Sequence, residues 1–97
     1  MHNINNVDLN LLKSLQALLA ERHVGKAAVS MNISQSAMSH TLARLRITFD
    51  DPLFVRTSKG LEPTARALEI SEKLSSVLID INHLFDSEAF NPSNIPT

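Results

Sequence analysis

Short hydrogen-bonding side chains recur in the segment QSAMSHTLAR, residues 35–44. If this segment is helical, each residue turns the helix by about 100°, which gathers most of its polar side chains opposite an apolar wedge. Amide, hydroxyl and imidazole groups on an exposed helix face can read base edges in the major groove of DNA. The residues that we expect to contact DNA in this way are Gln35, Ser36, Ser39 and His40.

Basic and hydroxyl side chains around this segment indicate contacts with phosphate. Arg44 lies one turn beyond His40, where an ion pair within the helix is an equal alternative. Arg56 and Lys59 belong to LFVRTSKGLEP, a predicted hairpin whose basic tip can contact the DNA backbone or minor groove. Ser34 is expected to cap the helix first and to contact phosphate second. The predicted phosphate contacts are Ser34, Arg44, Thr57 and Lys59.

Charge is distributed unevenly, although the 97 residues carry a net charge of only −1. Residues 22–66 hold seven Lys and Arg against three Asp and Glu, a net charge of +4, which favours a polyanionic partner. Cys is absent and the four His show no ligand spacing, so we expect no metal site. Ser39 and His40 diverge as helix neighbours and cannot form a nucleophile–base pair, so we expect neither an enzyme nor a cofactor.

The apolar pattern predicts a mainly α fold of four helices and one hairpin. The predicted ranges are 9–22, 26–31, 35–49 and 65–87 for the helices and 53–63 for the hairpin. Asp8, Ser34 and Thr64 are expected helix caps, and His23–Gly25 is expected to separate the first two helices. The small pair Ala27–Ala28 lets two helices cross closely. The apolar residues expected behind the reading helix are Ile33, Met38, Leu42 and Leu45. This arrangement is a helix–turn–helix followed by a wing.

The last predicted helix carries an apolar stripe with spacings of three and four residues. A helix of about 22 residues spans about 33 Å, which is longer than so small a domain can cover. We therefore expect the stripe to form a homodimer interface, the alternative being that it packs only on the chain's own first helix. The predicted interface residues are Ile70, Leu74, Val77, Leu78, Ile81 and Leu84.

Two runs of the sequence, AAVSMNISQSAMSHTLARLR and DPLFVRTSKGLEPTARA, together resemble the DNA-binding domain of LysR-type transcriptional regulators. The resemblance covers nearly the whole chain and implies a winged helix–turn–helix that dimerises through the long linker helix. Ser36 stands where the family often has proline, and His40 where it often has arginine, so the base preferred at His40 does not follow from the family. Family positions that contact DNA match Gln35, Ser36, Ser39, His40 and, in the wing, Arg56.

The same resemblance implies a larger C-terminal domain that binds a small co-inducer, which would make this chain an isolated DNA-binding fragment. The closing AFNP resembles the hinge before that domain, and the segments DLNLL and FDDPLFVR look similar to the LeuO-like and nodulation-regulator subgroup. The predicted organisation is a winged helix–turn–helix domain at 1–63, a dimerisation helix at 64–88 and a hinge at 89–97.

The sequence therefore predicts a bacterial transcription regulator that binds specific double-stranded DNA sequences as a homodimer. A tetramer is the alternative assembly expected for the full-length protein. Its co-inducer would bind only through the missing domain, and this fragment would hold no cofactor. The sequence has no apolar run of about 18 residues and no signal peptide, so a cytoplasmic protein without membrane contact is expected. The alternative is a helical protein-interaction module whose winged domain docks protein, which the near-neutral charge favours.

Overall fold

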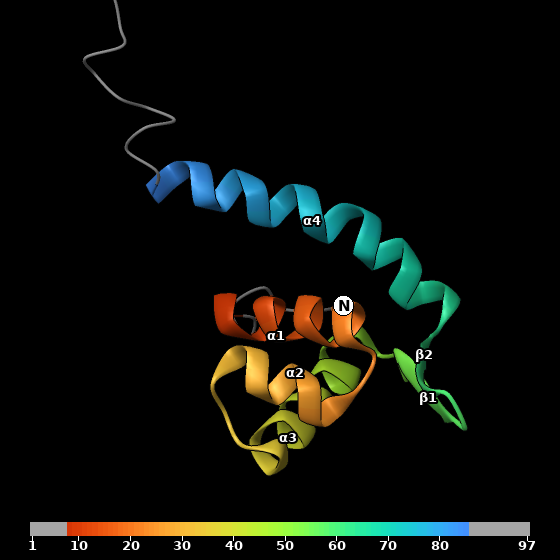
Figure 1. The fold of residues 1–97 in the computed structure, drawn as a ribbon. Coiled ribbons are helices and arrows are strands. Elements are labelled where there is room, and N and C mark those ends of the chain that lie inside the picture. Colours follow the sequence, from red (N-terminus) through yellow and green to blue (C-terminus); the bar gives the residue numbers. More distant parts are fainter. Residues whose placement is uncertain (1–7, 86–97) are drawn as a thin grey trace, which may run out of the picture.

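The structure is a computed structural model that describes residues 8–85 of the chain. Its elements are α1 (Leu9–Glu21), α2 (Val24–Met31), α3 (Gln35–Phe49), β1 (Phe54–Thr57), β2 (Gly60–Pro63) and α4 (Ala65–Phe85). Figure 1 shows α1, α2 and α3 bundled together, the hairpin at the edge of the bundle, and α4 running back over α1 in the opposite direction. The predicted mainly helical fold, with a hairpin and a long last helix, is confirmed.

Side-chain caps fix the starts of three helices. The Asp8 carboxylate and the hydroxyls of Ser34 and Thr64 each accept a hydrogen bond from the backbone N–H three residues later, at 2.7, 3.0 and 3.1 Å. Each bond satisfies a first-turn N–H that has no partner inside its helix. All three caps follow the prediction from sequence.

The break between α1 and α2 is shorter than predicted. Arg22 ends α1 with a left-handed φ of 54°, and Nδ1 of His23 accepts a hydrogen bond from the Lys26 N–H at 3.1 Å. Val24 and Gly25, which were expected in the break, are the first two residues of α2. Histidine is not among the preferred capping residues, so the sequence contains no ordinary signal for this start.

The core lies between the three bundled helices, the base of the hairpin and one side of α4. Met38, Leu42 and Leu45 are buried behind α3, as predicted. Ile33 is 36% exposed and lies outside the core, which corrects its prediction. Helical spacing does not place Ile33, because it lies in the turn before α3 begins.

The hairpin packs against the turn between α1 and α2. Its strands pair antiparallel from Phe54 opposite Pro63 to Thr57 opposite Gly60. The Leu61 N–H donates to the Arg22 carbonyl at 3.0 Å, and a Cβ on Gly60 would lie 2.9 Å from that same oxygen. Gly60 also has a φ of +115°, so both its conformation and its close contact require glycine.

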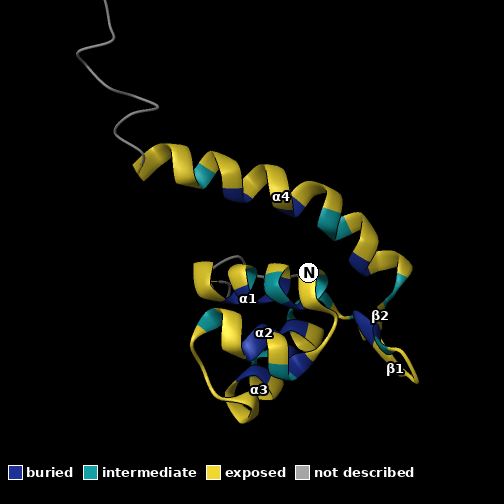
Figure 2. Ribbon diagram, in the orientation of Figure 1, coloured by how far each residue is buried: buried dark blue, intermediate teal, exposed yellow. Residues whose placement is uncertain are grey.

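The long helix α4 buries one side against α1 and leaves the rest exposed, as Figure 2 shows. Leu74 and Leu78, at 5% and 6% exposure, belong to the core of this chain, and Ile70 and Ile81 pack partly against it. Val77 and Leu84 are 44% and 79% exposed. The apolar stripe is therefore divided: Leu74 and Leu78 pack within the chain, while Val77 and Leu84 remain uncovered.

The predicted hinge at 89–97 and the last residues of the predicted final helix, 86–87, lie outside the described residues. Across residues 8–85, no helix combines the length and the apolar character needed to cross a membrane.

Candidate nucleic-acid interface

The exposed side of α3 carries the side chains predicted to read DNA. Gln35, Ser36, Ser39 and His40 are all exposed, while the opposite side of the helix is buried in the core. The Ser34 hydroxyl caps α3 and also lies 3.2 Å from the Ser36 hydroxyl. The first turn of α3 therefore presents hydroxyls together with the positive end of the helix dipole, a combination that suits phosphate.

A hollow of about 90 Å³ lies where α3 meets the start of α2 and the hairpin. Gln35 and Ser39 of α3 and Arg56 of β1 all line it, although Arg56 is far from the other two in sequence. A Cβ on Gly25 would lie 3.3 Å from Oε1 of Gln35 and 3.0 Å from the His23 ring. The start of α2 thus lies so close to α3 that the glycine at position 25 leaves room for the Gln35 side chain.

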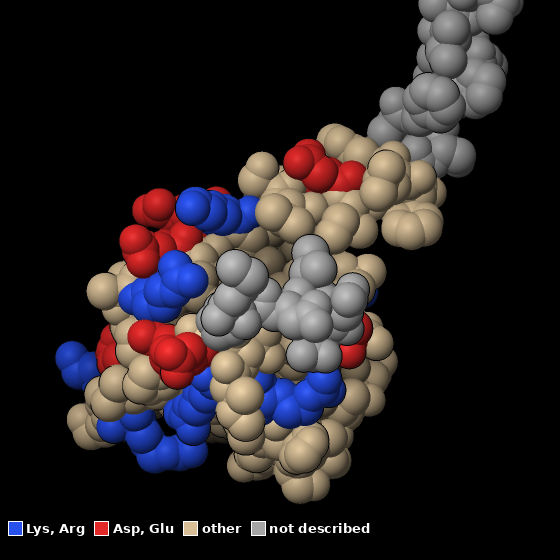
Figure 3. Space-filling model, turned by 180° about the vertical axis from the view of Figure 1, so that it is seen from behind, with Lys and Arg blue, Asp and Glu red and all other residues tan. Residues whose placement is uncertain are grey.

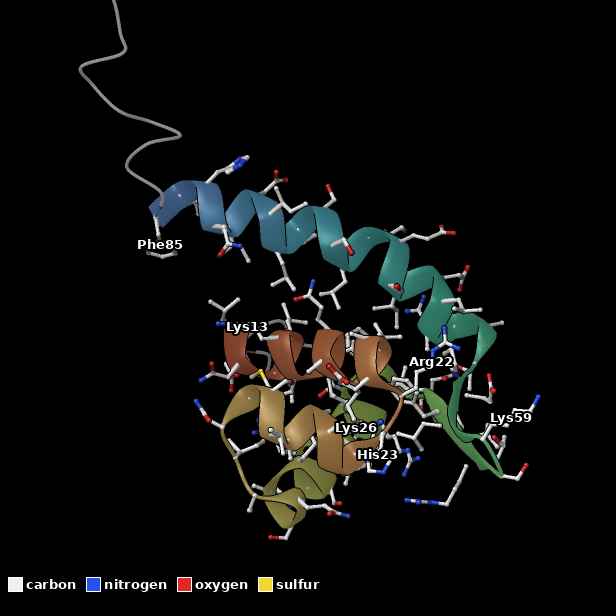
Figure 4. All side chains as sticks on the ribbon, in the orientation of Figure 1. Lys13, Arg22, His23, Lys26, Lys59 and Phe85 are labelled. Atoms are coloured by element: carbon white, nitrogen blue, oxygen red, sulfur yellow. The ribbon has the colours of Figure 1, made fainter. Side chains whose placement is uncertain are left out.

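The tip of the hairpin is held by Thr57 and extended into solvent by Lys59. The Thr57 hydroxyl donates to the Gly60 carbonyl at 3.0 Å and accepts from the Lys59 N–H at 3.1 Å. Because its proton is already donated within the turn, Thr57 serves the turn rather than offering a free donor to phosphate. Lys59 is exposed at the tip, where Figure 4 shows its side chain leading away from the bundle.

Arg44 does not join the residues at the hollow. It lines a separate depression on the other flank of α3, together with Asp8, Ile33 and Thr41. Within residues 8–85 the Arg44 guanidinium has no hydrogen-bond or ion-pair partner, so the alternative of an ion pair inside the helix is not realised. Cations therefore border α3 on both flanks, Arg56 on the wing side and Arg44 beside the start of α1.

Two residues that line the hollow, Arg22 and His23, were not predicted as functional. Arg22 pairs loosely with Glu62 at 3.8 Å, with both side chains about half exposed. His23 lies just before α2 and lines the hollow together with Gly60 and Leu61 of the hairpin, and Figure 4 labels both Arg22 and His23. Arg22 and His23 share the hollow with Arg56 only because the hairpin packs on the α1–α2 turn, for which the sequence contains no local signal.

Charged side chains are distributed unevenly between the reading side of the molecule and α4. Figure 3 shows Lys and Arg side chains gathered along the edge of the molecule opposite α4, while acidic and basic side chains are mixed along α4. In the part of the chain that the structure describes, no three His, Cys, Asp or Glu residues are grouped to hold a metal ion. The exposed chemistry around α3 and the hairpin is therefore hydrogen bonding and positive charge.

An exposed polar helix, a preceding helix joined to it by a tight turn, and a basic hairpin beside it define a winged helix–turn–helix domain. Residues 9–68 match the family described as bacterial regulatory helix-turn-helix protein, lysR family. The chain belongs to this family, which confirms the resemblance found in the sequence. Because the family consists of transcription regulators, the prediction that the chain is not an enzyme is also confirmed.

Relatives with curated names include the HTH-type transcriptional regulator YidZ of Salmonella newport (strain SL254), 48% identical over 83 residues, and that of Citrobacter koseri, 47% identical over 83 residues. Each match covers 86% of this chain and 26% of the relative, so the chain spans about a quarter of their length. These relatives are named YidZ, which corrects the similarity to LeuO-like and nodulation regulators that the segments DLNLL and FDDPLFVR suggested.

Solved structures show the same fold. The probable transcriptional regulator PA0477 of Pseudomonas aeruginosa is 40% identical, with a TM-score of 0.77 over 82% of this chain and 27% of its own. The CbnR DBD–DNA complex is 21% identical, with a TM-score of 0.76 over 84% of this chain and 94% of its own. At that identity the second similarity establishes the fold alone.

Proposed function

We propose that the chain binds double-stranded DNA with α3 in the major groove and the hairpin, as a wing, on the backbone or minor groove. The observation that carries this proposal is the convergence of Gln35, Ser39 and Arg56 on one hollow. A helix in the major groove places its first turns against base edges, and a wing beside it meets the adjacent backbone. CbnR and BenM, which share this fold, have been solved as complexes of their DNA-binding domains with DNA, which supports DNA as the partner.

Individual roles follow from position. Gln35, Ser36, Ser39 and His40 would read bases, because they are exposed on the first turns of α3. Arg44, Arg56 and Lys59 would contact phosphates on the two sides of the helix, with Arg56 also able to enter the minor groove. Ser34 would contribute mainly as a cap, and Thr57 mainly to the turn.

A homodimer joined through α4 is the second part of the proposal. Val77 borders an open groove of about 380 Å³ beside α4, whose apolar lining includes Leu12, Phe49 and Ile70. With Leu74 and Leu78 already buried, the predicted interface residues left for a partner are Val77 and Leu84 together with the exposed parts of Ile70 and Ile81. Two copies joined there would hold two reading helices at a fixed spacing, as operators with two half-sites require.

The longer relatives support a further step. We infer that the protein continues into a C-terminal domain that binds a small co-inducer, reached through the hinge expected at 89–97, and that the full-length protein can assemble further. Within the family, the 48% identity to YidZ favours a YidZ-like regulator over the LeuO-like subgroup.

Selection of bound sites from a pool of random duplexes, followed by binding measurements on the selected duplex over a range of salt concentrations, tests the proposal. If each subunit neutralises three or four phosphates, a dimer should give a slope of log affinity against log salt of about −5 to −7. A slope shallower than about −2, or a selection that enriches no sequence, would overturn it. Apolar docking of a protein, the alternative function, would be insensitive to salt.

A further inference from the structure

The chain makes a strained turn between α3 and the wing. Leu53 is fully buried and has a φ of +63°, and the Phe54 N–H donates to the Pro52 carbonyl two residues back at 2.6 Å. A three-residue turn of this kind around a branched, non-glycine residue is unfavourable and persists only where its surroundings fix it. Neighbouring residues must therefore hold this turn in place.

Arg46 and Asp51 hold the turn from its two sides. The Arg46 guanidinium donates from Nε to the Pro52 carbonyl at 2.8 Å and from Nη2 to the Phe54 carbonyl at 3.1 Å. The Asp51 carboxylate accepts from the Leu53 N–H at 2.8 Å. These residues, Arg46 with Asp51–Phe54, form what is here named the α3–wing joint.

The joint also reaches the start of α4. The same carboxylate oxygen of Asp51 accepts from the Thr64 hydroxyl at 2.8 Å, and the Thr64 N–H donates to the Leu53 carbonyl at 2.9 Å. Hydrogen bonds of the joint thus connect the end of α3, the start of the hairpin and Thr64, the residue just before α4.

Arg46 differs from Arg44, although both are exposed arginines of α3 two residues apart. Arg44 makes no hydrogen bond or ion pair within residues 8–85, whereas Arg46 is bound to two backbone carbonyls at the entry to the wing. A guanidinium suits this position because two of its nitrogens, Nε and Nη2, donate in a fixed planar fork, one to each carbonyl. The two arginines therefore have different tasks.

We propose that Arg46 is a positioning residue for DNA recognition: it fixes the wing relative to the reading side of α3, so that Arg56 lies at the correct distance from Gln35 and Ser39. The carbonyl that it holds belongs to Phe54, two residues before Arg56 on the same short strand. A wing freed at this point would keep its hairpin bonds but change its angle to α3. This inference rests on the proposed function.

A set of double-mutant cycles on the full chain tests it, with a duplex selected by the wild-type chain from a random pool as the probe. Arg46→Met keeps the apolar stem and removes both hydrogen bonds. It should weaken binding about fivefold to tenfold in the wild-type background and by the same factor with Gln35→Ala. With Arg56→Ala and Lys59→Ala together it should have almost no effect, because both wing contacts that it positions are already lost.

Two control variants separate positioning from contact. Arg46→Lys keeps the charge but replaces the rigid fork of two nitrogens by a single ammonium on a flexible stem, so it should bind nearly as weakly as Arg46→Met. Arg44→Met should weaken binding equally in every background, as a direct phosphate contact does. If Arg46→Lys restored wild-type affinity, or if the effect of Arg46→Met simply multiplied with that of Arg56→Ala and Lys59→Ala together, Arg46 would be a phosphate contact and the proposal would fail.

A measurement without DNA keeps this inference distinct from the proposed function. In the free chain, Arg46→Met should raise the hydrogen-exchange rates of amides at residues 54–61 about tenfold, while those in α1 stay unchanged. Equal exchange in the hairpin would overturn the proposal even if DNA binding were lost. If the selection enriched no duplex but hairpin exchange rose, the proposed function alone would fail.

Discussion

The helices α3 and α4 each bury one side and expose another, but they expose different chemistry. The apolar side of α3 is buried in the core of its own chain, and the exposed first turns of α3 carry amide, hydroxyl and imidazole groups. The exposed surface of α4 includes large apolar side chains, with Val77 at 44% and Leu84 at 79% exposure. Exposure of polar side chains to water costs little free energy, whereas covering exposed apolar side chains with a partner lowers the free energy of the system.

This difference assigns the two helices to different kinds of partner. The face of α3 suits a wet, charged and hydrogen-bonding surface such as DNA. The uncovered side of α4 suits another apolar helix. Four substitutions test that division, beginning with the one expected to have the largest effect on binding.

Val77→Glu should convert a dimer into a folded monomer. A charge at this position would meet its own copy across a two-fold axis, because an isologous contact repeats every change. Since two half-sites could no longer be held together, affinity for the selected duplex should fall by at least about 100-fold. Sedimentation analysis and thermal melting, alongside DNA titration, measure both effects.

Ser76→Glu is the matched control for Val77→Glu, because the neighbouring residue is exposed on a different side of α4. It should remain a dimer and bind as the wild type does. If Val77→Glu still sediments as a dimer, the interface lies elsewhere. If it unfolds, Val77 belongs to the core of one chain.

Leu74→Ala should destabilise the fold itself, by about 2–4 kcal/mol, because Leu74 is buried against the chain's own core. Leu84→Ala, on the same helix, should cost less than about 0.5 kcal/mol when both are measured by chemical denaturation in the Val77→Glu background. That background removes the contribution of the dimer. Similar costs for the two leucines would mean that α4 is not divided between core and partner.

Gln35→Ala should change which sequences are bound. Loss of its amide should cost about 1–3 kcal/mol for the best duplex and relax the preference at one base position. Lys59→Ala, at the wing tip, should instead weaken all duplexes about equally and reduce the salt slope by about 1 per contact. Repeating the selection with each variant shows the difference, and an unchanged preferred sequence for Gln35→Ala would exclude it from reading bases.

Local rules predicted much of this molecule from its sequence. Asp8, Ser34 and Thr64 cap their helices because capping depends on a side chain and an N–H three residues away. Helical spacing likewise placed Met38, Leu42 and Leu45 in the core. The order of helices and hairpin already indicated a helix–turn–helix with a wing, and the motifs of the family pointed to the same arrangement.

What the sequence did not predict depends on contacts between distant segments. The stripe on α4 looked like one surface, yet Leu74 and Leu78 pack against α1, because only the path of α4 across α1 decides which residues are covered. Nothing in the sequence singled out Arg46, whose guanidinium reaches two carbonyls only because of the strained turn at Leu53. The hollow lined by Gln35 and Arg56 likewise depends on how the distant hairpin packs beside α3.

Ser34→Ala should have the smallest effect of the four, and it separates stability from contact at the first turn of α3. The Ser34 hydroxyl accepts the Ala37 N–H at 3.0 Å, and its loss should cost about 1 kcal/mol of folding free energy. Ser36→Ala removes a hydroxyl from the same turn without removing a cap, so its folding cost should stay within about 0.5 kcal/mol. Denaturant melts of both variants, compared with their DNA affinities, distinguish the two serines. If Ser36→Ala proved the more destabilising, the hydrogen bond between the two hydroxyls, and not the cap, would organise the start of the reading helix.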